Sequence, residues 1–103
     1  MPVREISPTR SSEHAILVNE LTTEWTNPKS HQGEPLILVE KDRAGRPAHV
    51  YVIWEKWSSV ERGERSEIIV ESAEKSLPAQ EALNISIAMG LTQSEAQHLG
   101  LKF

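Results

Sequence analysis

The stretch LILVEKDRAGRPAHVYVIWEKW, residues 36–57, decides the fold. Two runs rich in β-branched and aromatic residues flank a short polar segment. In that segment Asp42 can start a type I turn and Gly45 can take the left-handed conformation. The pattern therefore predicts a β-hairpin over residues 36–57.

The second strand of this hairpin is apolar on both sides. If residues 49–57 are extended, Tyr51 and Trp57 point to one face, and Val52 and Trp54 point to the other. A strand covered on one side alternates apolar with polar residues, so here both faces must be covered or one is kept for a partner. The tryptophans are either core residues or anchors of an interface, where tryptophan is common. We predict a partner-binding surface at Tyr51, Trp54 and Trp57.

Helical patterns flank the hairpin in the sequence. Apolar residues recur at three- and four-residue steps in residues 12–25, which predicts a helix. A short strand at residues 15–18 is the alternative, because β-branched residues are common there. A second helix is predicted over residues 60–76, where Ser58 and Glu61 resemble a capping box.

The segment ALNISIAMG, residues 82–90, has two interpretations. Apolar residues at every second position predict a strand near residues 83–89. Ala82, Ile85 and Met89 also fit the spacing of a helix, so that alternative stays open.

The C-terminal segment carries a helix start and a helix stop. Thr92 and Glu95 have the spacing of a capping box, and Gly100 stands where a residue just after a helix belongs. We predict a short helix over residues 93–99.

Length and composition indicate one folded domain. The chain has 103 residues, of which 38% are hydrophobic and 25% charged, as is typical of globular proteins. Residues 1–11, with Pro2 and Pro8, are predicted to be a flexible arm, and residues 12–103 a single domain. Residues 26–35 are predicted to form a loop.

The composition also suggests where the protein works. The chain has no cysteine, which suits a reducing compartment, and its N-terminus lacks the apolar stretch of about 7–15 residues that a signal peptide needs. The longest uncharged apolar-rich run, residues 82–91, is about half as long as a membrane helix. We expect a cytoplasmic protein that does not span a membrane.

Charge distinguishes the hairpin from the rest of the chain. The net charge is −4, which argues against bulk binding to a phosphate backbone. Residues 41–65 are nevertheless locally basic, with six Lys and Arg against four Asp and Glu. Lys41, Arg43 and Arg46 near the hairpin tip either keep an edge soluble or contact nucleic acid.

No pattern of a metal or catalytic site is present in the sequence. The four histidines, at positions 14, 31, 49 and 98, are too far apart to give the usual ligand spacing for zinc. No nucleophile elbow and no glycine-rich phosphate loop occurs. We therefore expect no metal and no cofactor, and for the enzyme hypothesis only a site between subunits, built from His49 and nearby glutamates.

Three segments resemble the BolA-like proteins: HVYVIWEKW, followed by SSVERGERSEIIVESA, and then ISIAMGLTQSEA, together about half of the chain. The resemblance implies a class II KH-like α+β fold and a tendency to bind partners. BolA-like proteins bind monothiol glutaredoxins and share an iron–sulfur cluster through a histidine just before the last strand. That place falls here on Leu83, which cannot ligate a metal, and His49 near a second ligand position does not replace it.

These observations predict one α+β domain, with a small, mainly antiparallel sheet around a central hairpin and two to three helices packed on it. The apolar surplus of the second strand predicts a homodimer or a sheet continued across two chains. For function we expect a non-enzymatic binding or adaptor protein acting through protein–protein contacts on a sheet face. The alternative is a nucleic-acid-binding module that uses the basic hairpin, and an enzyme is the third class.

Overall fold

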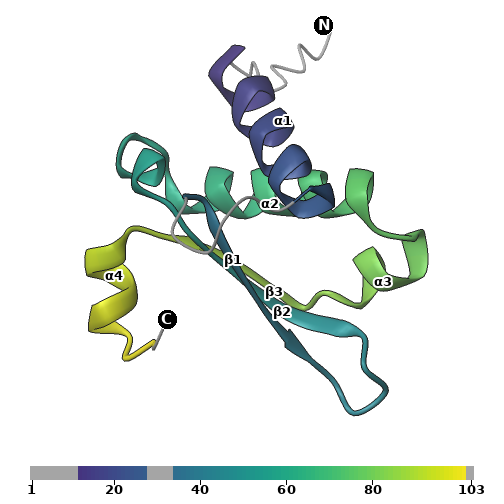
Figure 1. Cartoon of the computed structure of the whole chain (residues 1–103). Coiled ribbons are helices and arrows are strands. Elements are labelled where there is room, and N and C mark those ends of the chain that lie inside the picture. Colours follow the sequence, from purple (N-terminus) through teal and green to yellow (C-terminus); the bar gives the residue numbers. More distant parts are fainter. Residues whose placement is uncertain (1–11, 28–33, 102–103) are drawn as a thin grey trace, which may run out of the picture.

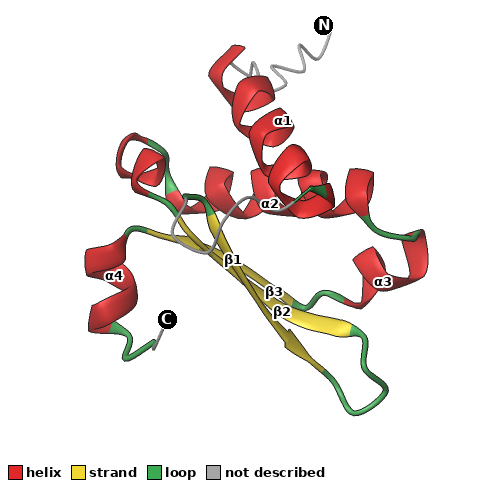
Figure 2. Cartoon of the chain, in the orientation of Figure 1, coloured by secondary structure: helices red, strands yellow, loops and turns green. Residues whose placement is uncertain are grey.

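A computed structural model describes residues 12–27 and 34–101, arranged as helices on both sides of one sheet (Figures 1 and 2). The predicted arm, residues 1–11, and residues 28–33 of the predicted loop lie outside the described residues. The elements in chain order are α1 (Ser12–Thr26), β1 (Leu36–Lys41), β2 (Pro47–Ile53), a 3-10 helix η1 (Glu55–Ser59), α2 (Arg62–Ser76), α3 (Ala79–Asn84), β3 (Ile87–Leu91) and α4 (Gln93–His98).

The three strands form one mixed sheet in the order β1-β2-β3. β1 and β2 are antiparallel, as the hairpin prediction requires, whereas β3 runs parallel to β2. The α+β class is confirmed, with one antiparallel and one parallel pair where a mainly antiparallel sheet was expected. The hairpin loop is built as predicted, since Asp42 begins it and Gly45 has a φ of +80°.

The main core lies between the sheet and helices α1 and α2. α1 confirms the helix predicted over residues 12–25, so the strand alternative at residues 15–18 is wrong. Thr22 donates its hydroxyl to the carbonyl of Val18, which occupies a side chain that otherwise disfavours helices. The buried members of this core are Leu17, Val18, Leu21, Val50, Val52, Trp54, Trp57, Val60, Ile68 and Ile69.

The second strand is shorter than predicted. It ends at Ile53, and residues 55–59 turn into η1. The prediction that Trp54 and Trp57 lie on opposite faces of one strand is therefore wrong. The turn brings both indoles into the same core, where their ring centroids are 5.1 Å apart at 82°, an edge-to-face pair.

The helix predicted over residues 60–76 is confirmed as α2, which begins at Arg62. Its N-cap residue is Glu61, and no side chain caps the helix there. The predicted capping box of Ser58 and Glu61 is wrong because Ser58 belongs to η1.

Residues 82–90 contain parts of both predicted alternatives. α3 extends to Asn84, so Leu83 is a helical residue, and it is 83% exposed. The strand begins only at Ile87 and continues to Leu91. The predicted strand near residues 83–89 is correct in its second half and wrong in its first.

The last helix follows its local signals. Thr92 and Glu95 form the predicted capping box, and Gly100 has a positive φ of 76° directly after the helix end. α4 packs on the sheet face that α1 and α2 leave uncovered. Its cluster there consists of Ile53, Leu91 and Ala96, with Leu36, Leu38 and Leu101 packed against them.

Candidate docking surface

The face of the sheet opposite α1 and α2 is only partly covered. Directly opposed residues share a face, so this face has three rows across the strands. They are Leu36–Ile53–Leu91, Leu38–Tyr51–Met89 and Glu40–His49–Ile87. α4 covers the first row, and we call the six residues of the other two rows the open face.

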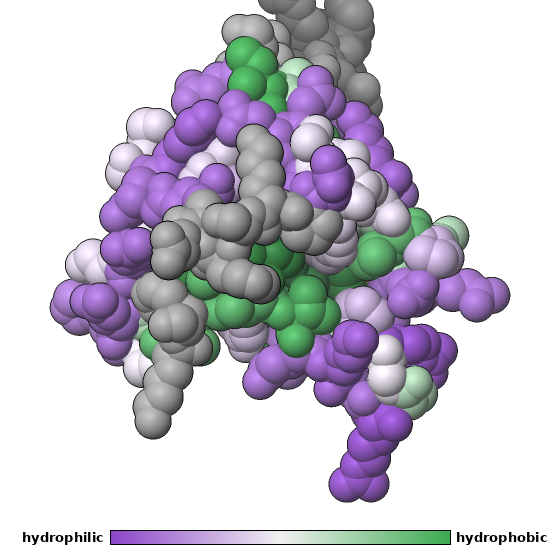
Figure 3. All heavy atoms as spheres, in the orientation of Figure 1, coloured by the Kyte–Doolittle hydropathy of each residue, from purple (hydrophilic) through white to green (hydrophobic). Residues whose placement is uncertain are grey.

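Four of the six residues of the open face are aliphatic or aromatic or carry a thioether, namely Leu38, Tyr51, Ile87 and Met89. Ile87 is 39% exposed and Met89 is 38% exposed, while Leu38 and Tyr51 are half-buried. In the orientation of Figure 1, apolar surface is visible at the level of the strands, between hydrophilic surfaces above and below it (Figure 3). Half-exposed apolar residues on adjacent strands are a feature of interaction sites.

A polar corner adjoins this apolar area. Nδ1 of His49 lies 2.8 Å from Oε1 of Glu40. Burial raises the pKa of the Tyr51 phenol, and the charge and hydrogen bond of the neighbouring Glu40 carboxylate raise it further. Tyr51 is therefore a neutral phenol at physiological pH, with an apolar ring and one polar group.

The three predicted partner-binding residues do not lie together on the surface. Tyr51 is on the open face, but Trp54 is 2% exposed and Trp57 is fully buried. The indole of Trp57 donates to the carbonyl of Val52 at 3.0 Å, so it supports β2 from the helix side. On the open face Tyr51 lies beside Met89, with Ile87 in the next row, and the two indoles lie on the helix side of the sheet.

The basic residues of the alternative prediction surround the hairpin loop. Lys41, Arg43 and Arg46 are exposed there. Asp42 accepts hydrogen bonds from the backbone N–H groups of Arg46 and Ala44, and the first of these is the main reason why its pKa is lowered. The ionised Asp42 thus holds the loop in shape and offsets part of its positive charge.

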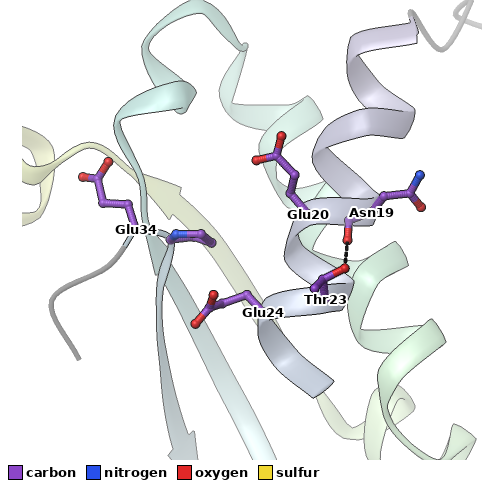
Figure 4. A pocket seen from close by; sticks show the side chains of 6 residues that line it. Asn19, Glu20, Thr23, Glu24 and Glu34 are labelled. Atoms are coloured by element: carbon purple, nitrogen blue, oxygen red, sulfur yellow. Dashed lines mark hydrogen bonds between the residues drawn. The ribbon is translucent and has the colours of Figure 1, made fainter. Parts of the chain in front are cut away.

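A shallow pocket of about 260 Å³ lies between α1 and the residues that precede β1 (Figure 4). Its lining is acidic, with Glu20 and Glu24 on α1 and Glu34 across from them. Nζ of Lys56 lies 2.8 Å from Glu20. The surplus of carboxylates disfavours phosphate or nucleic acid at this pocket. His49 does not line it, so the enzyme hypothesis gains no cavity from it.

Two part-buried side-chain networks, around His14 and around Arg65, were not anticipated from the sequence. Both ring nitrogens of His14 on α1 face carboxylates of α2, at 3.1 Å from Glu64 and 3.2 Å from Glu71. Nη1 of Arg65 lies 2.7 Å from Glu95. Their partners are 30 to 57 residues away in the sequence, so no local signal marks them. The first network joins α1 to α2, and the second joins α2 to α4.

Within residues 12–27 and 34–101 no three His, Asp or Glu side chains come together as metal ligands. None of the helices described is both long enough and apolar enough to cross a bilayer.

Comparison with protein families, with curated proteins and with solved structures gave no match to this chain.

Proposed function

We propose that this protein is a non-enzymatic binding or adaptor module whose docking surface is the open face. The supporting observation is that the Leu38–Tyr51–Met89 row is apolar on all three strands and is only partly covered within the described residues: Leu38 packs against the α4 cluster, whereas Met89 is 38% exposed. Burying such a row gains about 25 cal/mol per Å² of apolar surface. Tyrosine and methionine are also enriched at protein interfaces.

In this proposal Tyr51 contacts the partner, and Trp54 and Trp57 act indirectly. The two indoles fill the core under β2, and the edge-to-face contact between them fixes the chain where the strand ends. A rigid platform lowers the entropy lost on binding. Replacing either tryptophan is therefore expected to weaken binding by loosening the sheet.

A matched pair of variants tests the open face. Met89 on β3 and Val70 on α2 are 38% and 39% exposed, so they offer similar apolar area on opposite sides of the molecule. Met89→Lys is expected to lose a protein that wild type and Val70→Lys both recover from native cell extract. Circular dichroism would first show that both variants are folded. Equal recovery by the two variants would contradict the proposal, as would recovery by none of the three chains.

The proposal includes self-association and a reducing, cytoplasmic environment. The environment is supported by the lack of cysteine. Self-association is supported by the small size of the open face. This face consists of two rows of residues across three strands, with the rows about 7 Å apart and the strands about 5 Å apart. A stable interface buries about 800 Å² per partner, which exceeds what this area offers. A homodimer with its two open faces side by side would offer a partner twice this area.

A second candidate is nucleic-acid binding through the hairpin loop, because Lys41, Arg43 and Arg46 are all exposed. It predicts that binding to a single-stranded oligonucleotide weakens steeply with salt and is lost in Arg43→Ala/Arg46→Ala. Absent or salt-insensitive binding would eliminate this candidate. The acidic pocket and the net charge of −4 weigh against it.

We retain the BolA-like resemblance as a proposal about the fold and about partner binding. It depends on the order of hairpin, helix, strand and short helix, and here η1 precedes the helix α2 and a further helix, α3, precedes β3. The cluster-binding role is not included, because the residues between α3 and β3 are Ile85 and Ser86, which are not ligands of iron–sulfur clusters.

A further inference from the structure

The two edges of the sheet differ in how their backbone groups are satisfied. On the β3 edge, α2 donates side-chain hydrogen bonds to the strand: Arg65 to the carbonyl of Gly90 and Ser66 to the carbonyl of Ala88. These bonds occupy the acceptors that an added strand would need. On the β1 edge, none of the described residues does the same.

β1 also has the composition of an interior strand. Its residues Leu36 to Val39 are all aliphatic, so both faces are apolar, although the strand lies at the edge of the sheet. Continuous apolar runs are typical of strands that have neighbours on both sides and cover on both faces. In the single chain, Val39 is 38% exposed and the other three are half-buried.

The features that usually protect an edge strand stand only at the two ends of this run. Pro35 precedes it, and an irregularity in the register at Glu40/Lys41 follows it. Between them, four residues form an edge that is not protected by any residue of the described ranges 12–27 and 34–101. Four residues are enough to pair with a short strand of another chain.

We propose that β1 pairs antiparallel with β1 of a second copy, with Leu38 on the two-fold axis, to give one six-stranded sheet. This inference deepens the homodimer proposal and rests on it. In a continuous sheet, residues that lie opposite each other on neighbouring strands point to the same face. An even-numbered residue of one β1 must therefore lie opposite an even-numbered residue of the other, and an odd-numbered residue opposite an odd-numbered one. With Leu38 on the axis, Ile37 lies opposite Val39 of the partner subunit, and all three central pairs are apolar.

A second copy fits this edge better than an unlimited stack of chains. Joining two β1 edges leaves a β3 edge at each end of the new sheet, and those edges carry the Arg65 and Ser66 hydrogen bonds. Growth therefore stops at two chains. A closed dimer removes the exposed edge that would otherwise promote aggregation.

The pairing would also enlarge the docking surface. The Leu38–Tyr51–Met89 row of one chain would meet the same row of the second copy at the axis. Six strands at the usual spacing give one apolar row about 24 Å long. This is long enough for a helix of about 16 residues at 1.5 Å per residue.

Single cysteines test the register, because the natural chain has none. Residues on the axis face their own copies with Cα atoms about 4.5–5.5 Å apart, within the range of a disulfide. Leu38→Cys is therefore expected to form a disulfide-linked dimer on mild oxidation. Ile37→Cys and Val39→Cys are each expected to stay largely unlinked, since their own copies lie diagonally, about 7–8 Å away. A mixture of those two variants should cross-link.

The control is Glu74→Cys, an exposed position on α2. Linkage of Leu38→Cys no greater than that of Glu74→Cys, together with no linkage in the Ile37→Cys and Val39→Cys mixture, would overturn the inference. Linkage strongest for Val39→Cys alone would overturn the register. If light scattering then still gave a dimer, the homodimer proposal would survive without this edge, whereas a monomer would overturn both. Partner binding by the open face is tested separately, through Met89 and Val70.

Discussion

Substituting Gly90 by alanine tests the packing of β3 against the helix layer. A Cβ atom on Gly90 would lie 2.8 Å from two atoms of the Trp57 indole and 2.9 Å from Cβ of Arg65. Neither neighbour can move freely, because Trp57 is fully buried and donates to Val52, and Arg65 donates to the carbonyls of Val60 and of Gly90 itself. The added methyl group must therefore displace the indole or separate the strand from α2.

The size of the effect follows from two contributions. Overpacking a filled core costs about 1–3 kcal/mol. Weakening the buried hydrogen bond from Trp57 to Val52 adds about 1 kcal/mol. We expect Gly90→Ala to lower the free energy of unfolding by about 2–4 kcal/mol. For a domain of this size the melting temperature should fall by about 8–16 °C.

The assay is urea unfolding followed by far-ultraviolet circular dichroism, since tryptophan fluorescence would report the displaced indole itself. The matched control is Gly63→Ala on α2, where a Cβ atom would meet nothing within 4 Å. That control should leave stability unchanged or raise it by up to about 1 kcal/mol, because alanine favours helices over glycine. A Gly90→Ala chain as stable as wild type would refute the packing described for Trp57 and Arg65.

Two further predictions concern the side-chain networks of His14 and of Arg65 with Glu95. His14→Ala should lower the free energy of unfolding by about 1–3 kcal/mol in the same urea assay, because it removes a ring that is 2% exposed and its hydrogen bonds to Glu64 and Glu71. His98→Ala, at an exposed position, should change it little, and equal effects of the two substitutions would argue against the network. The pKa of Glu95 is lowered to about 2, first by the hydrogen bond from the Thr92 backbone and then by Arg65. Its folded-state pKa lies below its unfolded one, so its contribution is present above about pH 4.5 and is lost as the pH falls toward 2. The stability difference between wild type and Glu95→Gln should shrink over that range, and a constant difference would contradict the role given to Glu95.

Elements with local signals were predictable from the sequence. The hairpin loop is specified by Asp42, which is bonded to residues of the same loop, and by Gly45, which has a positive φ. Both signals lie within the loop itself. The capping box of Thr92 and Glu95 is local in the same sense. α1 followed from the spacing of its apolar residues, which is the strongest signal a sequence carries for a helix.

The end of β2 and the start of β3 were not predictable, because distant parts of the chain decide them. The backbone N–H of Trp54 donates to the carbonyl of Leu91, which is 37 residues away, just before the chain turns into η1. Leu83 fits the alternation of a strand, yet Asn84 donates to Asp42 and to the Pro47 carbonyl and thereby fixes the end of α3 at the hairpin.

The candidate site was predictable only in part. Because residues 49–57 are apolar on both faces, the sequence indicated that both faces are covered or that one binds a partner. Tyr51 lies on the open face. Ile87 and Met89 could not be added to it without the strand order, since the sequence does not say which strand lies beside β2 or in which direction. The burial of Trp54 and Trp57 depends on η1, and the sequence of η1 is equally compatible with an extended strand.

The mass of the wild-type chain in solution is the most direct test of self-association, in which a second copy of the chain pairs with the β1 edge. Size-exclusion chromatography with light scattering at high micromolar concentration should give twice the 11.6 kDa of the chain, falling toward 11.6 kDa on dilution. A mass of 11.6 kDa at every concentration would contradict this pairing, because Val39, which is 38% exposed, and the β1 edge that no described residue covers would then have no second copy beside them.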